Sequence, residues 1–269
     1  MVVAFADVAK APKDLFKKPF NAGKTDIDIK SGIFTLKNSV AGDKLKSELE
    51  FKAEDALLGL GKGFTLPLTK KYDGKTVKLE FKKAFDSNGN KLNVDFNTNI
   101  VPESAAYSHT LKTKITGANF VAGVDLSVDN PAGATFHACT ALKNNTIGVS
   151  GSLSDPTALN YIYSPCGGLF FETNLKNHTL HLYKKSGDTA VATRVGFACG
   201  SADSSFALAV KKSLASGADL SIKADQSGSI DVAHVSNLSD GVKMTLGANF
   251  NSLNLAAAPK FGAGFEFNF

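Results

Sequence analysis

The strongest constraint on the fold is an alternation of apolar and polar residues that begins at Lys24 and continues to the C-terminus. In 91–100, every second residue from Leu92 to Ile100 is apolar or threonine, and asparagine or aspartate lies between them. The last segment repeats the pattern with Phe261, Ala263, Phe265, Phe267 and Phe269. A period of two is that of a β-strand, and about ten residues is the length that a tilted strand needs to cross a bilayer. The sequence therefore predicts β-strands of membrane-spanning length.

The same pattern recurs between frequent turn signals. Three further alternating segments are 120–128, 219–225 and 241–250, and turns such as Ser87-Asn88-Gly89-Asn90 separate the strands. Most predicted loops have two to five residues, which join antiparallel neighbours into hairpins. We count 19 or 20 strand candidates, with 53–71 as the ambiguous stretch. No shift in composition indicates a linker, so one long antiparallel meander is expected.

The first 23 residues follow a different period. Their apolar positions recur at helical spacing, and charged residues occupy the other side; the apolar set is Phe5, Val8, Pro12, Leu15 and Phe16. A proline inside a helix removes a hydrogen bond and clashes with the preceding turn. We therefore expect a break or kink at Pro12 and two short helical pieces, the second ending at Pro19. The predicted organisation is a helix and hinge over 1–23 and a barrel over 24–269.

Composition excludes several classes of protein. No run approaches the ~18 apolar residues of a membrane-spanning helix. The net charge of +5 is spread along the chain without a basic block, so nucleic-acid binding is not expected. Cys139, Cys166 and Cys199 form no CxxC pair, and no catalytic or metal-ligand pattern stands out. We expect no cofactor, no metal and no enzymatic activity.

Alternation alone does not say which face of the sheet meets water. A barrel of about eight strands fills its interior with side chains, whereas 16 or more strands leave an aqueous lumen. With so many strands, the apolar stripes are expected to face lipid and the polar stripes to line water. The rival is a pair of stacked sheets with a buried apolar face, which does not explain why the strands have nearly equal lengths. The sequence therefore favours a membrane β-barrel that works as a pore.

Two segments resemble the mitochondrial voltage-dependent anion channel family, also called eukaryotic mitochondrial porins. Residues 5–18, which read Phe-Ala-Asp-Val-Ala-Lys-Ala-Pro-Lys-Asp-Leu-Phe-Lys-Lys, resemble the opening helix of that family. Residues 240–269 resemble its last hairpin, including the Gly-apolar-Lys opening at Gly241. The end of the chain also matches the sorting signal of mitochondrial outer-membrane barrels, with Lys260, Gly262, Phe265 and Phe267 at the motif positions.

This resemblance implies an all-β fold: one transmembrane barrel of about 19 strands with the short amphipathic helix in the lumen. It implies a multi-pass protein of the mitochondrial outer membrane that conducts voltage-dependently, with weak anion selectivity, and passes ATP, ADP and phosphate. Implied partners are the lipid bilayer, the permeating anions and nucleotides, and the outer-membrane barrel assembly machinery; homo-oligomerisation stays open. The chain departs from the family where a glycine-rich hinge is usual, because 19–23 reads Pro-Phe-Asn-Ala-Gly.

The candidate functional residues are cationic. We expect eight lysines to line the lumen and attract anions: Lys10, Lys13, Lys17 and Lys18 on the helix, and Lys78, Lys82, Lys223 and Lys243 on polar strand faces. Rings of cationic side chains raise the local anion concentration and lower the barrier for anionic solutes. The alternative interpretation is that these lysines only form the wet face that any such barrel needs.

Two other functions remain open from the sequence. The first is the related protein-import pore of the same membrane, which predicts a long N-terminal extension and acidic patches inside the barrel. The second is a soluble or surface-exposed β-sandwich for adhesion or lipid binding, which alkaline carbonate would release from membranes.

Overall fold

The computed structural model describes residues 3–17, 19–32, 34–54, 65–71, 76–143, 145–155, 158–201 and 203–269. These residues form two compact units. The first unit takes its residues from Met1–Val8, Ile33–Leu36 and Ser47–Pro165, and the second from Ala9–Gly32, Lys37–Lys46 and Cys166–Phe269.

The N-terminal segment forms two short helices, α1 (Phe5–Val8) and α2 (Lys10–Lys17). Two pieces were predicted, but the prediction of a break at Pro12 was wrong, because the chain leaves the helix at Ala9 instead. Pro12 is the third residue of α2, where a backbone N–H has no intrahelical acceptor and its loss costs little. No helix in the described part of the chain is long and apolar enough to cross a membrane.

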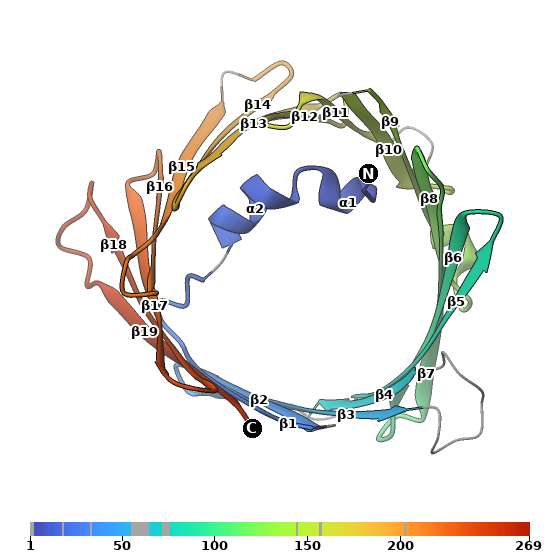
Figure 1. Cartoon of the computed structure of the whole chain (residues 1–269), viewed down its shortest axis with the longest axis horizontal. Helices are drawn as coiled ribbons and strands as arrows, with labels where there is room; N and C mark the ends of the chain where they lie inside the picture. The colour runs from blue at the N-terminus through green and yellow to red at the C-terminus, as the bar shows by residue number, and fades with distance from the viewer. Residues whose placement is uncertain are drawn as a thin grey trace. The chain divides into compact units, whose positions relative to one another are not determined.

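The first unit contains α1 and a run of antiparallel strands. Its strands are β4 (Thr65–Lys71), β5 (Thr76–Ser87), β6 (Asn90–Val101), β7 (Ala106–Thr116), β8 (Phe120–Ser127), β9 (Thr135–Leu142) and β10 (Asn145–Ser152), and the 3-10 turn η2 (Pro131–Gly133) precedes β9. Strands β2 (Phe34–Ala41), β3 (Lys44–Glu54) and β11 (Asn160–Cys166) contribute residues to both units. Helix α1 contacts β9 and β10 (Figure 1).

The second unit contains α2 and the strands of the C-terminal half. These are β1 (Thr25–Ser31), β12 (Leu169–Thr173), β13 (Asn177–Ser186), β14 (Thr189–Ala198), β15 (Ser204–Ser213), β16 (Asp219–Asp225), β17 (Ser229–Ser239), β18 (Val242–Asn251) and β19 (Lys260–Asn268). Helix α2 lies along β13–β16 (Figure 1). The alternating segments that the sequence singled out are β6, β8, β16, β18 and β19, so those predictions are confirmed.

The nineteen strands of the described residues belong to one hydrogen-bonded sheet. Sequential strands are antiparallel, as in the β5–β6 and β13–β14 pairs, whereas β1 and β19 are parallel. Strand β1 pairs with β2 on one side and with β19 on the other, so the first and last strands are joined. In an antiparallel series of odd number, the first and last strands run in the same direction, which is why this joint is parallel. The fold is an all-β, 19-stranded barrel with a short N-terminal helical segment.

Candidate functional site

The large apolar side chains of the second unit are exposed on one face of its strands. Leu182 is 47% exposed, Phe206 48% and Ile222 41%. In the registers they share this face with residues such as Val191 and Val210, because alternate residues point to the same side of a strand. A continuous exposed apolar face of this kind is stable only against another apolar medium.

Helix α2 packs on the opposite face of the same strands. Phe16 is 7% exposed and forms a core cluster with three alanines of β14 and β15: Ala192, Ala207 and Ala209. Leu15 and Tyr183 pack against this cluster. Small side chains on this face let the helix approach the sheet closely. The face that carries α2 is therefore the one that also carries the polar side chains, and the apolar face is left for lipid, as the sequence analysis expected.

A basic pocket of ≈ 230 Å³ lies between α2 and β13–β16. Its charged lining comes from Lys13 and Lys17 on α2 and from Arg194, Lys223 and Asp225 on the strands. Cations outnumber the single carboxylate in this lining, so an anion in the pocket lowers the electrostatic energy of the site. We call this set of five residues the basic pocket.

One side of the basic pocket is an ion-paired cluster. Lys13 pairs with Glu172 of β12, and the imidazole Nε2 of His181 lies 3.8 Å from the other oxygen of that carboxylate. His181 is only 2% exposed, and it lies on β13, one of the strands on which α2 packs. The Arg194 guanidinium carbon lies 5.0 Å from the centroid of the Phe16 ring, within cation–π distance. Helix α2 is thus held to the sheet by an apolar anchor and by charged contacts beside it.

The structure brings three of the eight predicted lysines together. Lys13, Lys17 and Lys223 line the basic pocket, where Lys223 also pairs with Asp231 at 2.9 Å. Lys10 instead pairs with Asp14 on α2 at 2.7 Å and is not part of the pocket lining. Lys18 lies outside the described residues.

Lys243 lies in a different environment within the second unit. It lines a smaller pocket of ≈ 130 Å³ together with Asp26, Asp28 and Glu266. Three carboxylates therefore share this pocket lining with a single ammonium. The carboxylates of this lining offset the positive charge of Lys243, whereas the described residues provide no ion pair for Lys17.

The two predicted lysines of β5 lie in the first unit and share one carboxylate. Lys78 pairs with Glu80, and Lys82 approaches the other oxygen of Glu80 at 3.0 Å. Lys82 also lines a pocket of ≈ 450 Å³ on the polar face, with Asp95, Lys112 and Lys114. Lys112 forms an ion pair with Asp125 at 2.7 Å. This region holds alternating charges and is less positive than the basic pocket.

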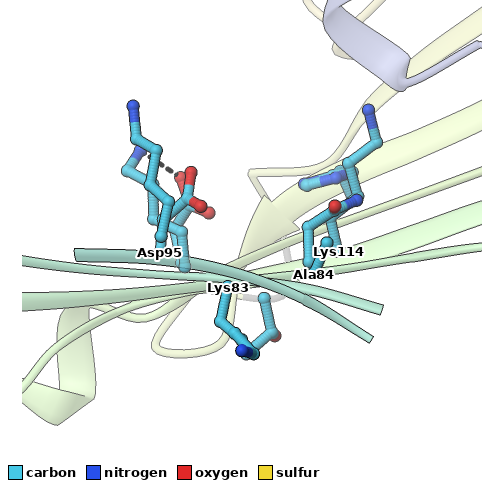
Figure 2. Close-up of a pocket in the computed structure, with 10 residues that line it drawn as sticks. Lys83, Ala84, Asp95 and Lys114 are labelled. Carbon is cyan, nitrogen blue, oxygen red and sulfur yellow. Dashed lines mark hydrogen bonds and ion pairs between the residues drawn. The ribbon is translucent and has the colours of Figure 1, made fainter. Parts of the chain in front are cut away.

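Figure 2 shows that side chains in this region project from both sides of the strands. Asp95 and Lys114 project from one side of the strands, and Lys83 projects from the other. Lys82 stands opposite Asp95 in the register, whereas Lys83 stands opposite Val94. Lys82 and Lys83 therefore belong to the polar and the apolar face, respectively.

Sequence reasoning missed three features of the site: Arg194, the alanines of β14 and β15, and Glu172. Arg194 is the single arginine of the chain and lies at a polar-face position of β14. The alanines of β14 and β15 alternate on the same face, in Thr-Ala-Val-Ala-Thr-Arg and Phe-Ala-Leu-Ala-Val. A lone arginine beside a run of small residues on the polar face could have indicated from the sequence that another segment of the chain packs on these strands. Glu172 carries no such signal, because its pairing with Lys13 joins distant parts of the chain.

The residues of the predicted sorting signal lie in β19. Phe265 and Phe267 point to the apolar face, where their rings stack with centroids 6.5 Å apart. Lys260 and Gly262 lie on the other face, and a Cβ at Gly262 would clash with the backbone carbonyl of Asn21. The absence of a side chain at Gly262 thus allows Asn21 to pack against β19 in the folded protein.

Comparison with known proteins identifies the family. The family described as eukaryotic porin matches residues 2–262. The chain belongs to the eukaryotic porin family. It is 26% identical over 287 residues to the non-selective voltage-gated ion channel VDAC2 of Meleagris gallopavo, which covers 98% of this chain and 93% of that protein. It is 26% identical to a probable voltage-dependent anion-selective channel of Caenorhabditis elegans, over 98% of this chain and 97% of that protein.

A human relative gives the same result. The chain is 26% identical to the non-selective voltage-gated ion channel VDAC3 of Homo sapiens, over 97% of both proteins. This porin family consists of channels and not of enzymes, and it places the chain in the mitochondrial outer membrane, in contact with the lipid bilayer and with permeating ions. The protein-import pore and the soluble β-sandwich are not favoured.

Proposed function

We propose that this porin is a voltage-gated, weakly anion-selective channel that passes small ions and metabolites such as ATP, ADP and phosphate. The observation that carries the proposal is the basic pocket, in which Lys17 of α2 and Arg194 of β14 lie on the polar face. The weakness of the selectivity follows from the ion pairs, because Glu80, Glu172 and Asp231 each neutralise part of the cationic lining. Nucleotides and phosphate are the metabolite anions that a positive lining favours.

Voltage gating requires charges that can move in the membrane field. Helix α2 carries Lys10, Lys13, Lys17 and Asp14 and is joined to β1 by the hinge at 19–23. The proposed division of the chain is therefore a helix and hinge over 1–23 that regulates a barrel over 24–269. We include in the proposal assembly by the outer-membrane barrel machinery through Lys260, Gly262, Phe265 and Phe267, with homo-oligomerisation left to measurement.

The test is the reversal potential of the refolded protein in a planar bilayer under a potassium chloride gradient. We expect a modest preference for chloride that decreases in Lys17→Gln and in Arg194→Gln. Lys10→Gln is the matched control, because Lys10 carries the same charge on the same helix but is not part of the pocket lining. A cation preference in the unmodified protein would overturn the proposal, as would equal effects of all three substitutions.

A further inference from the structure

Two lysines of the second unit lie on the apolar face of the sheet. Lys184 follows Leu182 by two residues in β13 and stands opposite Val191 of β14. Lys212 follows Val210 by two residues in β15 and stands opposite Leu220 of β16. Both lysines are exposed. Alternate residues share a face, so both side chains leave the sheet on the side of the exposed apolar residues.

Both lysines lie near the same edge of that face. Strand β13 ends at Ser186, β14 begins at Thr189 and β15 ends at Ser213, so these three strand ends are adjacent in the antiparallel order. Thr189 pairs with Ser186 on one side and with Lys212 on the other. The two lysines are two strands apart, about 10 Å across the sheet, and are offset by two residues, about 7 Å along it. Two long lysine side chains can converge over this distance on one group.

The described residues give neither lysine a carboxylate partner within 4.0 Å. The neighbouring Lys211 differs from them, because it pairs with Asp219 at 2.8 Å on the polar face. An unpaired ammonium on a lipid-facing surface is tolerated near the edge of the hydrocarbon, where the side chain extends to the headgroup region. Lys184 and Lys212 therefore present, at adjacent strand ends, two positive charges for which the described residues provide no carboxylate partner.

The surface that continues from these lysines toward the middle of the strands is apolar. Val191 and Val210 stand side by side in the register, and Ile222 follows on β16, 41% exposed. The two lysines at the strand ends can bind an anionic headgroup, and the apolar side chains beside them can contact the acyl chains attached to it. Free phosphate makes no favourable contact with apolar side chains. The arrangement therefore favours a membrane lipid over a soluble anion.

We infer that Lys184 and Lys212 form a binding site for the headgroup of an anionic phospholipid, whose acyl chains lie along Val191, Val210 and Ile222. The hydroxyl-bearing Thr189 lies between the two lysines on the same face and can donate a hydrogen bond to the phosphate. The site does not depend on the ion selectivity of the pore, because it lies on the other face of the strands.

The chain supplies a matched control for this site. Lys185 and Lys211 are the direct sequence neighbours of the two lysines, and both stand opposite Ala190 on the polar face. The double variant Lys184→Gln with Lys212→Gln removes two charges from the apolar face. The double variant Lys185→Gln with Lys211→Gln removes two charges from the same strand ends on the polar face.

The experiment measures lipid retention by native mass spectrometry after purification of the full chain from nanodiscs of phosphatidylcholine with a minority of phosphatidylglycerol. We expect the unmodified protein and the Lys185/Lys211 variant to retain phosphatidylglycerol preferentially, and the Lys184/Lys212 variant to lose this preference by roughly tenfold. Single-channel conductance of each variant verifies that the barrel is intact. The polar-face variant should instead shift the reversal potential toward cations.

Three results would overturn the inference. The first is equal retention of phosphatidylglycerol by the unmodified protein and the Lys184/Lys212 variant. The second is an equal loss in both double variants, which would show a general effect of net charge. The third is displacement of phosphatidylglycerol by millimolar inorganic phosphate, which would assign the lysines to a soluble anion. None of these results bears on the reversal potential of the unmodified protein, so they are distinguishable from a failure of the proposed channel function.

Discussion

The backbone carbonyl of Asn21 occupies the space in which a side chain at position 262 would begin, so Asn21 and Gly262 are in backbone contact. Asn21 is 5% exposed, and its amide also lies against Gly247 and Gly264. Next to it, the Gly23 amide donates to the carbonyl of Phe261 at 3.0 Å. The hinge that connects α2 to the barrel is therefore seated on β18 and β19, where glycines leave room for it.

This contact predicts that a methyl group added at either glycine displaces the hinge from β18 and β19. Gly247→Ala and Gly262→Ala should both displace Asn21, and single-channel recordings should show more frequent closures than in the unmodified protein, because α2 loses its fixed attachment. Ala248→Val is the control, since Ala248 follows Gly247 on the apolar face. Unchanged recordings for both glycine variants would contradict the role of the contact.

The same two glycine variants distinguish the packing of the hinge from the sorting of the protein to the outer membrane. Gly262 belongs to the proposed sorting motif and Gly247 does not. Import into isolated mitochondria should be impaired by Gly262→Ala and unaffected by Gly247→Ala, although both disturb the hinge. Equal import of both variants would remove Gly262 from the signal.

The anchor of α2 predicts a second set of changes. Phe16→Ala removes a buried ring from the cluster with Ala192, Ala207 and Ala209, at a cost of about 3 kcal/mol for the docked helix. The undocked helix should expose Lys13 to trypsin, and cleavage should become faster. Lys10→Gln should leave the rate unchanged, because Lys10 is exposed and pairs with Asp14 along the helix, away from the buried cluster. A Phe16→Ala protein as resistant as the unmodified one would show that the cluster does not hold α2.

The ion pair of Lys13 with Glu172 predicts opposite shifts in selectivity from its two halves. Glu172→Gln removes a carboxylate beside the basic pocket and should raise the chloride preference in reversal-potential measurements. Lys13→Gln should lower it, because Glu172 and its negative charge remain. The double variant should return close to the unmodified value, and a clear departure would show that the two charges act on different parts of the path.

Adjacent lysines on β5 provide a test of which face lines the pore. Lys82→Gln should decrease the chloride preference, because Lys82 lies on the face of Asp95 and Lys112. Lys83→Gln removes the same charge one position later, on the opposite face (Figure 2), and should leave the reversal potential unchanged. An effect of Lys83→Gln without an effect of Lys82→Gln would show that the face of Lys83 lines the pore.

The sequence by itself determined the strands, because the pleat of a β-strand imposes a period of two wherever one face meets lipid and the other meets water. That local rule was enough for β6, β18 and β19, and for a strand count close to that of the described residues. The helical period at the N-terminus was equally readable. The position of its break was not, because Pro12 is tolerated in the first turn of α2 and the interruption falls at Ala9.

Only the tertiary structure decided how the charges act. The lysine pattern predicted that eight lysines line the lumen, but it could not show that Lys13, Lys78 and Lys223 each have a carboxylate partner. The described residues provide no ion pair for Lys17 of α2 or for Arg194 of β14, which both line the basic pocket. The contacts of Lys13 with Glu172 and of Asn21 with Gly262 join residues far apart in the chain. No local periodicity encodes such contacts, because they arise from the register of the sheet and from the face on which the helix packs.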